Sequence, residues 1–234
     1  FVTVTRHIGI AACSAEGAAL CYRTICSEGA ELLGPHGHPE ISMHTPSLAD
    51  YVQCLEAGDL EGVGELMLAS VGKLQSAGAD FVICPDNTIH QAFSHVRPRS
   101  PLPWLHIADV VAGEAAARDF QRLALMGTRW LVDSEVYPEK LAGRGLDCER
   151  PEPEERDEIN RIIMDELVCG VFKSDALRYL QGVAGRLKDA GCDGLVLGCT
   201  ELPLIIDDAT SPLPTLDSTR LLARAALHHA VDGG

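Results

Sequence analysis

Two segments of this chain, one before its midpoint and one near its end, repeat the same pattern. Each begins with Leu-x-x-Ala-Gly-x-Asp, at residues 74–80 and 187–193, and continues into a short apolar run. A glycine of this kind ends a helix, and the apolar run after it is typical of a buried parallel strand. The second segment lies 113 residues after the first, and this offset sets Cys199 opposite Asp86. The repeat therefore predicts two similar halves.

Strands and helices are expected to alternate through both halves. The first half opens with an apolar run at residues 7–12 and an amphipathic stretch at 17–33, and a segment similar to the first strand and its turn recurs at 122–128. Such alternation favours parallel sheets with right-handed crossovers. Polar residues just past the carboxyl ends of parallel strands lie where open α/β sheets bind ligands. We therefore expect an α/β chain of two similar lobes, with parallel sheets flanked by helices and an active site in the cleft that the lobes share.

The lobe boundaries are expected where proline breaks the pattern. Three prolines fall within residues 97–103, which indicates a crossing between lobes. The expected lobes are residues 1–98 with 210–234, and residues 99–209. Within the second lobe, the acidic, proline-broken segment 148–157 is interpreted as a loop, followed by a helix over 158–167.

Composition excludes several classes of function. The formal net charge of −15 argues against nucleic-acid partners and anionic membrane surfaces, which require basic patches. No apolar stretch approaches the roughly 20 residues of a membrane span, and no signal-peptide pattern is present. Nine cysteines, scattered and odd in number, favour a reduced cytoplasmic protein over a disulfide scaffold. A small molecule is the expected partner.

No cofactor or metal is expected. The chain lacks the G-x-G-x-x-G fingerprint of dinucleotide-binding folds. Cys21 and Cys26, like His36 and His38, lack the spacing of structural zinc ligands. Buried apolar thiols and a solvated loop are the better interpretation of these four residues.

Cys199 is the strongest candidate for a chemical role. It follows Gly198, which permits a tight turn, and precedes Thr200 and Glu201. Backbone N–H groups at such a strand end stabilise a thiolate, so the pKa of the thiol is expected to fall toward neutrality. A buried, inert thiol is the alternative, and it is accepted for the other eight cysteines. For Cys199 the repeat favours function.

Asp86 is the second candidate. The segment Pro-Asp-Asn-Thr is also good turn chemistry, so a helix N-cap is an equal alternative for this residue on local grounds. Its place opposite Cys199 in the repeat favours a catalytic or substrate-orienting role.

These residues resemble a known family. Asp86-Asn87-Thr88-Ile89-His90 is similar to the Cys-Asn-Thr-x-His motif of cofactor-independent aspartate/glutamate racemases, and residues 198–204 match their Gly-Cys-Thr-Glu-x-x-Leu motif. The resemblance extends over nearly the whole chain. It also includes Ser14 and Glu16, the segment 103–109, and Gly127-Thr128.

The resemblance implies a fold and a mechanism. Members of the family have two α/β lobes about a pseudo-twofold axis, are usually homodimers, and use neither metal nor pyridoxal. Two thiols flank the substrate α-carbon: one removes the α-proton and the other delivers a proton to the opposite face. By this resemblance Cys199 and Asp86 are the catalytic pair. The substrate-binding set that it implies is Asn87, Thr88, Thr200, Ser14, Thr128, Cys13 and His90.

The chain departs from the family pattern at several positions. Asp86 stands where the family has its first cysteine, and Ala11-Ala12-Cys13 replaces Gly-Gly-Met. Segments 43–47 and 168–173 offer no clear counterpart to the basic residues that some aspartate racemases use, so dicarboxylate specificity does not follow.

These departures leave the reaction open. The first hypothesis is racemisation at the α-carbon of a small carboxylate such as an acidic amino acid. The alternatives are a one-thiol decarboxylase, lyase or cis-trans isomerase, and a catalytically silent carboxylate-binding protein.

Overall fold

The chain divides into two compact units. The computed structural model describes residues 5–232; its first unit comprises residues 5–107 with 219–232, and its second comprises Ala108–Ser218. Each boundary lies nine residues beyond the expected ones at 98/99 and 209/210. The proline-rich segment stays in the first unit because the strand after it, β4 (Trp104–Leu105), pairs with β3 (Phe81–Ile83). In the same way β8 (Thr215–Asp217) pairs with β7 (Gly194–Leu197) in the second unit.

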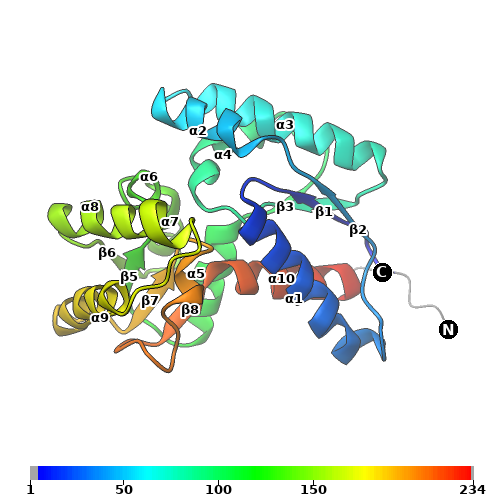
Figure 1. Cartoon of the computed structure of the whole chain (residues 1–234). Helices are drawn as coiled ribbons and strands as arrows, with labels where there is room; N and C mark the ends of the chain where they lie inside the picture. Colours follow the sequence, from blue (N-terminus) through cyan, green and yellow to red (C-terminus); the bar gives the residue numbers. More distant parts are fainter. Residues whose placement is uncertain (1–4, 233–234) are drawn as a thin grey trace. The chain divides into compact units, whose positions relative to one another are not determined.

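The first unit is built on a four-stranded parallel sheet of order β2-β1-β3-β4. Its central strands β1 (Ile8–Ala11) and β3 are buried along their whole length, as a continuous apolar run dictates when helices cover both faces. Strand β2 (Ile41–His44) forms one edge. Helices lie on both faces of this sheet (Figure 1). They are α1 (Ala15–Leu33), α2 (Leu48–Glu56), α3 (Leu60–Ser76), the 3-10 helix η1 (Thr88–Ala92), α4 (Phe93–Val96) and α10 (Ser218–Asp232).

The second unit repeats this topology. Its parallel sheet has the order β6-β5-β7-β8, with β5 (Arg122–Met126) and β7 at the centre and β6 (Asp147–Glu149) at the edge. Leu123 lies opposite Gly194, as Ile8 lies opposite Phe81 in the first unit. Phe81 and Gly194 are separated by the 113 residues of the sequence repeat. The prediction of two similar parallel α/β lobes is confirmed.

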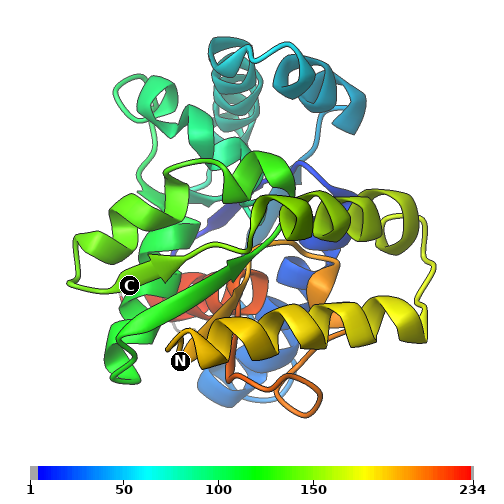
Figure 2. The same cartoon turned by 90° about the vertical axis from the view of Figure 1, so that its left-hand side faces the viewer.

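Helices α8 (Pro153–Arg161) and α9 (Ser174–Asp189) form a hydrophobic core with the sheet of the second unit. Figure 2 shows them beside each other, in yellow-green and yellow. Their apolar residues pack with those of β5 and β7 in one cluster. The remaining helical segments of this unit are α5 (Ile107–Ala117), α6 (Arg129–Val132), α7 (Val136–Ala142), the π-helical segment Ile162–Leu167 and the 3-10 helix η3 (Leu202–Leu204).

The expected loop at 148–157 is wrong in two places. Residues 147–149 form the edge strand β6, and helix α8 begins at Pro153, five residues before the predicted start. Glu152 and Glu155 form a reciprocal capping box there, and Pro153 occupies the first turn, where its missing N–H costs nothing. The acidic residues and the proline interpreted as a loop are therefore a helix start.

Within residues 5–232, no helix has both the length and the apolar character that crossing a bilayer requires.

Candidate active site

The predicted site residues of the first unit lie in the turns after β1 and β3, two neighbouring strands. After β1, Cys13 is buried, and Ser14 caps helix α1 by accepting a hydrogen bond from the Gly17 amide at 3.3 Å. Cys13 packs in one core cluster with Cys84, which directly follows β3. The sheet thus brings the two turns together at its carboxyl edge.

The Asp86 side chain caps the helix that follows it. Its Oδ1 accepts a hydrogen bond from the Ile89 amide at 3.1 Å, while the residue stays partly exposed. This hydrogen bond is of the capping kind weighed as the alternative from the sequence, although the residue at the N-cap position of η1 is Asn87. The hydrogen bond holds the carboxylate at the start of η1 and so orients the Asp86 side chain. It does not exclude a chemical role for Asp86.

His90 lies behind Asp86. Its Nδ1 is 2.6 Å from the Asp86 carbonyl oxygen, and its Nε2 lies 3.5 Å from the Ile107 amide nitrogen. An amide can only donate, so Nε2 accepts, Nδ1 carries the proton and the ring is neutral. The ring is buried, edge to face with His106 at 4.5 Å between centroids. Through these contacts the His90 ring supports the backbone of the Asp86 turn.

Asn87 and Thr88 complete this turn. Both are buried, with 3% and 9% of their surfaces exposed. The Asn87 carbonyl accepts a hydrogen bond from the His90 amide at 3.2 Å, and the Thr88 carbonyl accepts one from Gln91 Nε2 at 3.1 Å. The backbone of the whole turn is therefore held by hydrogen bonds within the first unit.

In the second unit, the turns after β5 and β7 touch. The Gly198 amide donates to the Met126 carbonyl at 2.8 Å. A Cβ at Gly198 would lie 2.6 Å from the Leu131 side chain and 2.9 Å from that carbonyl, so a larger residue cannot fit here. Thr128 is buried beside this contact and caps α6 through the Leu131 amide at 3.4 Å. The close approach fixes the backbone directly before Cys199.

Cys199 donates a hydrogen bond to a carboxylate. Its Sγ lies 2.8 Å from Glu201 Oε2, and the Thr200 hydroxyl donates to the same oxygen at 2.8 Å. Cys199 is partly exposed, whereas only 6% of the Glu201 surface is exposed. A nearby carboxylate favours the protonated thiol over the thiolate, and it is also a base placed to take the thiol proton. Glu201 thus joins the site.

Sequence reasoning did not include Glu201 among the site residues. The available signal was its position two residues after Cys199, where a turn at the end of a strand can fold the side chain back. The expected thiolate was to be stabilised by backbone amides alone, without any contribution from a side chain. The structure adds a buried proton acceptor within hydrogen-bonding distance of the sulfur.

The family model described as Asp/Glu/Hydantoin racemase matches residues 10–226. The chain belongs to the Asp/Glu/hydantoin racemase family.

Solved structures similar to this racemase-family chain share its whole fold. A candidate Asp/Glu racemase from Yersinia pestis superposes with a TM-score of 0.90 at 26% identity, covering 97% of this chain and 99% of that one. PH1733, an aspartate racemase homologue from Pyrococcus horikoshii OT3, gives a TM-score of 0.83 at 27% identity, covering 96% and 99%.

A curated relative is similar in sequence. The broad specificity amino-acid racemase RacX of Bacillus subtilis (strain 168) is 23% identical over 158 residues, which cover 66% of each chain. The match therefore spans just under two thirds of the length of that relative.

Three other thiols of this racemase-family chain have raised pKa values. Burial raises the pKa of Cys148 to about 12 and raises the pKa of Cys84 well above its ordinary value. The pKa of Cys192 is also raised, chiefly by burial. A high pKa keeps a thiol protonated and unreactive at neutral pH.

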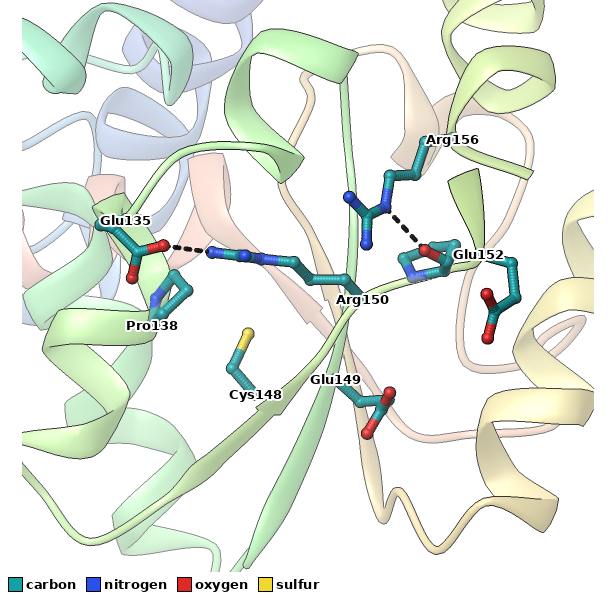
Figure 3. Close-up of a pocket in the computed structure, with 8 residues that line it drawn as sticks. Glu135, Pro138, Cys148, Glu149, Arg150, Glu152 and Arg156 are labelled. Carbon is teal, nitrogen blue, oxygen red and sulfur yellow. Dashed lines mark hydrogen bonds and ion pairs between the residues drawn. The ribbon is translucent and has the colours of Figure 1, made fainter. Parts of the chain in front are cut away.

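A polar cavity of about 370 Å³ lies elsewhere in the second unit (Figure 3). Arg150 crosses it and donates to the Ser134 carbonyl and to Glu135, each at 2.8 Å, while Arg156 donates to the Pro151 carbonyl at 2.7 Å. No predicted site residue lines this cavity. Among residues 5–232, no three His, Cys, Asp or Glu side chains gather in a way that could hold a metal ion.

Proposed function

We propose that this protein is an amino-acid racemase that acts without a cofactor at the α-carbon of a small carboxylate. Cys199 and Asp86 would serve opposite faces of that carbon. The observation that carries the proposal is the hydrogen bond from the Cys199 thiol to Glu201, in the segment that matches the family motif. Membership of the racemase family supports the reaction class.

The chemistry begins with transfer of the thiol proton. Glu201 accepts the proton from Cys199, and the resulting thiolate removes the α-proton of the substrate. Asp86 in its protonated form returns a proton to the other face. For the reverse direction the Asp86 carboxylate is the base and Cys199 is the acid.

The substrate carboxylate needs hydrogen-bond donors. We assign this role to Asn87, Thr88 and Thr200, with Ser14, Thr128 and Cys13 lining the site. The buried polar side chains of Asn87 and Thr88 beside Asp86 support the assignment. His90 acts through the Asp86 backbone, because its ring is hydrogen-bonded to the Asp86 carbonyl oxygen. We further expect a homodimer, which analytical ultracentrifugation would test.

One observation favours a second candidate. Because the Asp86 carboxylate already accepts a hydrogen bond from the Ile89 amide, it would be a weaker base than a free thiolate. A one-thiol reaction, in which Cys199 alone delivers or removes the proton, fits this asymmetry. Decarboxylation of a substituted malonate, β-elimination and cis-trans isomerisation are reactions of this kind.

The test is NMR in D₂O with a panel of L- and D-amino acids, substituted malonates and maleate. Deuterium at Cα with inversion supports the racemase, and loss of CO₂, elimination or isomerisation supports the one-thiol candidate. Substrate binding without any turnover across the panel would contradict both and leave a carboxylate-binding protein.

A further inference from the structure

The hydroxyl of Tyr51 lies beneath the Asp86 turn without a hydrogen bond. Tyr51, on helix α2, is fully buried, and its Oη has no partner among the described residues. The ring packs in one core cluster with Cys13, Cys84 and Ile89. Ile89 is the residue whose amide binds the Asp86 carboxylate. A buried hydroxyl without a partner is costly, so its position requires an explanation.

A chain of polar groups leads from the surface to this hydroxyl. Helix α3, which packs against α2 on the sheet (Figure 1), carries Ser70 and Lys73. His44 Nε2 lies 2.9 Å from Lys73 Nζ, and His44 Nδ1 lies 2.9 Å from Ser70 Oγ. The Ser70 hydroxyl lies beside the Tyr51 phenol, although their geometry falls short of a hydrogen bond.

The hydrogen-bond donors of Lys73 and His44 both point along this series of polar groups toward Ser70. A lysine ammonium has only donors, so His44 Nε2 accepts and its Nδ1–H donates to Ser70. Burial and the neighbouring Lys73 lower the pKa of His44, which keeps the ring neutral as this arrangement requires. The Ser70 proton is then free to turn toward Tyr51, which leaves the Tyr51 proton for an acceptor other than Ser70.

The acidic groups around Tyr51 identify the acceptor. Cys84 and Cys13, at the ends of β3 and β1, and Asp86 lie within electrostatic reach of the phenol, and Cys54 belongs to the same helix. Burial raises the pKa of Tyr51 itself, so the phenol stays a donor. The pKa of Cys84 is also raised well above its ordinary value, so that thiol stays neutral. Asp86 is the carboxylate among these groups.

We propose that Tyr51 is a positioning residue for Asp86: its hydroxyl, oriented by Ser70 and His44, donates through one water to the Asp86 carboxylate and stabilises the ionised form. The proposal rests on the proposed function for its meaning in catalysis. The hydrogen bond itself, which favours the ionised form of Asp86, can be tested without turnover.

The experiment titrates Asp86 by ¹³C NMR in the full-length chain labelled at aspartate carboxyl carbons, with Asp86→Asn used for assignment. Removing a donor from a carboxylate raises its pKa. Tyr51→Phe should therefore increase the proton affinity of Asp86 by about threefold to tenfold, as expected for one hydrogen bond. Ser70→Ala and His44→Ala should shift it in the same direction by less.

Tyr137→Phe is the matched control. Tyr137 is also fully buried, but it belongs to the second unit and has Ser218 as its hydroxyl partner. This variant should leave the Asp86 titration unchanged. Tyr51→Phe should keep the wild-type Tm, because the lost hydroxyl makes no hydrogen bond with the protein.

Two readouts distinguish failure of this proposal from failure of the proposed function. An Asp86 titration identical in wild type and Tyr51→Phe, with the fold intact, would overturn the proposal even if the enzyme racemises. A shifted titration in a protein that turns over no substrate would uphold it and overturn the racemase instead. In an active enzyme, the acid limb of the pH profile for exchange at the Asp86 face should shift upward in Tyr51→Phe and not in Tyr137→Phe.

Discussion

The turns after β3 and β7 occupy the same place in two sheets of identical order, yet their side chains are held in opposite ways. Asp86 accepts a hydrogen bond from its own turn, through the Ile89 amide. Cys199 donates one to a neighbouring side chain, Glu201. The duplicated backbone therefore carries an anchored acceptor in the first unit and a donor paired with a base in the second. Similar topology does not impose similar chemistry.

The largest expected effect comes from removing the thiol. Cys199→Ala should reduce α-proton exchange by at least about 10³-fold, because it removes the thiol that we propose exchanges a proton with the α-carbon. Cys169→Ala, which alters an exposed cysteine of the same unit, is the control and should keep full activity. Exchange is followed by ¹H NMR in D₂O and folding by circular dichroism. Near-normal exchange in folded Cys199→Ala would refute the assignment.

The thiols should also differ in reactivity. Because the pKa of Cys148 is about 12, only about 10⁻⁴ of it is thiolate at pH 8, so iodoacetamide should modify it about 10³-fold more slowly than an ordinary thiol. Cys199, which is partly exposed, should react ahead of Cys148 and Cys21, and a saturating carboxylate ligand should protect it. Peptide mass spectrometry gives the order. Cys148 modified first would contradict it.

Replacing the acceptor tests the other side of the comparison. Asp86→Asn keeps an oxygen to cap Ile89 but removes the base, so inversion should fall by at least about 100-fold while exchange from the Cys199 face persists. Asp86→Cys should make exchange from L- and D-substrates more even. Equal loss for both enantiomers in Asp86→Asn would instead indicate a binding or structural residue.

Glu201→Gln separates charge from shape. Without the carboxylate, turnover should fall by about 10- to 100-fold, since the thiol loses its proton acceptor. The Cys199 thiolate becomes easier to form, so alkylation at pH 7 should become faster. Glu166→Gln, at another buried carboxylate of the second unit, should change neither rate. Unchanged turnover and unchanged alkylation in folded Glu201→Gln would refute the role of Glu201 at the thiol.

The smallest effect concerns stability. Asp86→Ala removes the cap from η1 and should lower the free energy of unfolding by about 0.5 to 2 kcal/mol, whereas Asp86→Asn should lower it by less. Urea denaturation of the two variants measures the difference. Equal stabilities would show that the Ile89 hydrogen bond contributes nothing.

The central strands could be predicted from sequence because they are buried and apolar along their length, apart from the partly exposed Arg122 at the start of β5. Strand β3 and strand β7 appear as the two copies of the repeat, with the register that the 113-residue offset requires. The edge strand β6 could not be found in this way. Its three residues, Asp-Cys-Glu, have no strand character of their own, and pairing with β5 creates the strand.

The site was predictable to the extent that it follows local sequence. The position of Asp86 past a strand and its capping role both follow from Pro-Asp-Asn-Thr. The contacts that orient the turn do not, because they come from distant segments: Ile107 binds His90 across 17 residues, and Tyr51 reaches the turn from α2. Such long-range packing leaves no periodic signal along the chain.

The discontinuity of the first unit has a consequence for synthesis on the ribosome. Its last helix, α10, supplies buried side chains such as Leu222 and Ala226, and Arg224 pairs there with Glu28 at 2.8 Å. The second unit, in contrast, is one continuous segment. A growing chain can complete the second unit first, while the strands made earliest must wait for the last helix to emerge. Damage to α10 would therefore destabilise the unit whose strands are translated before the second unit.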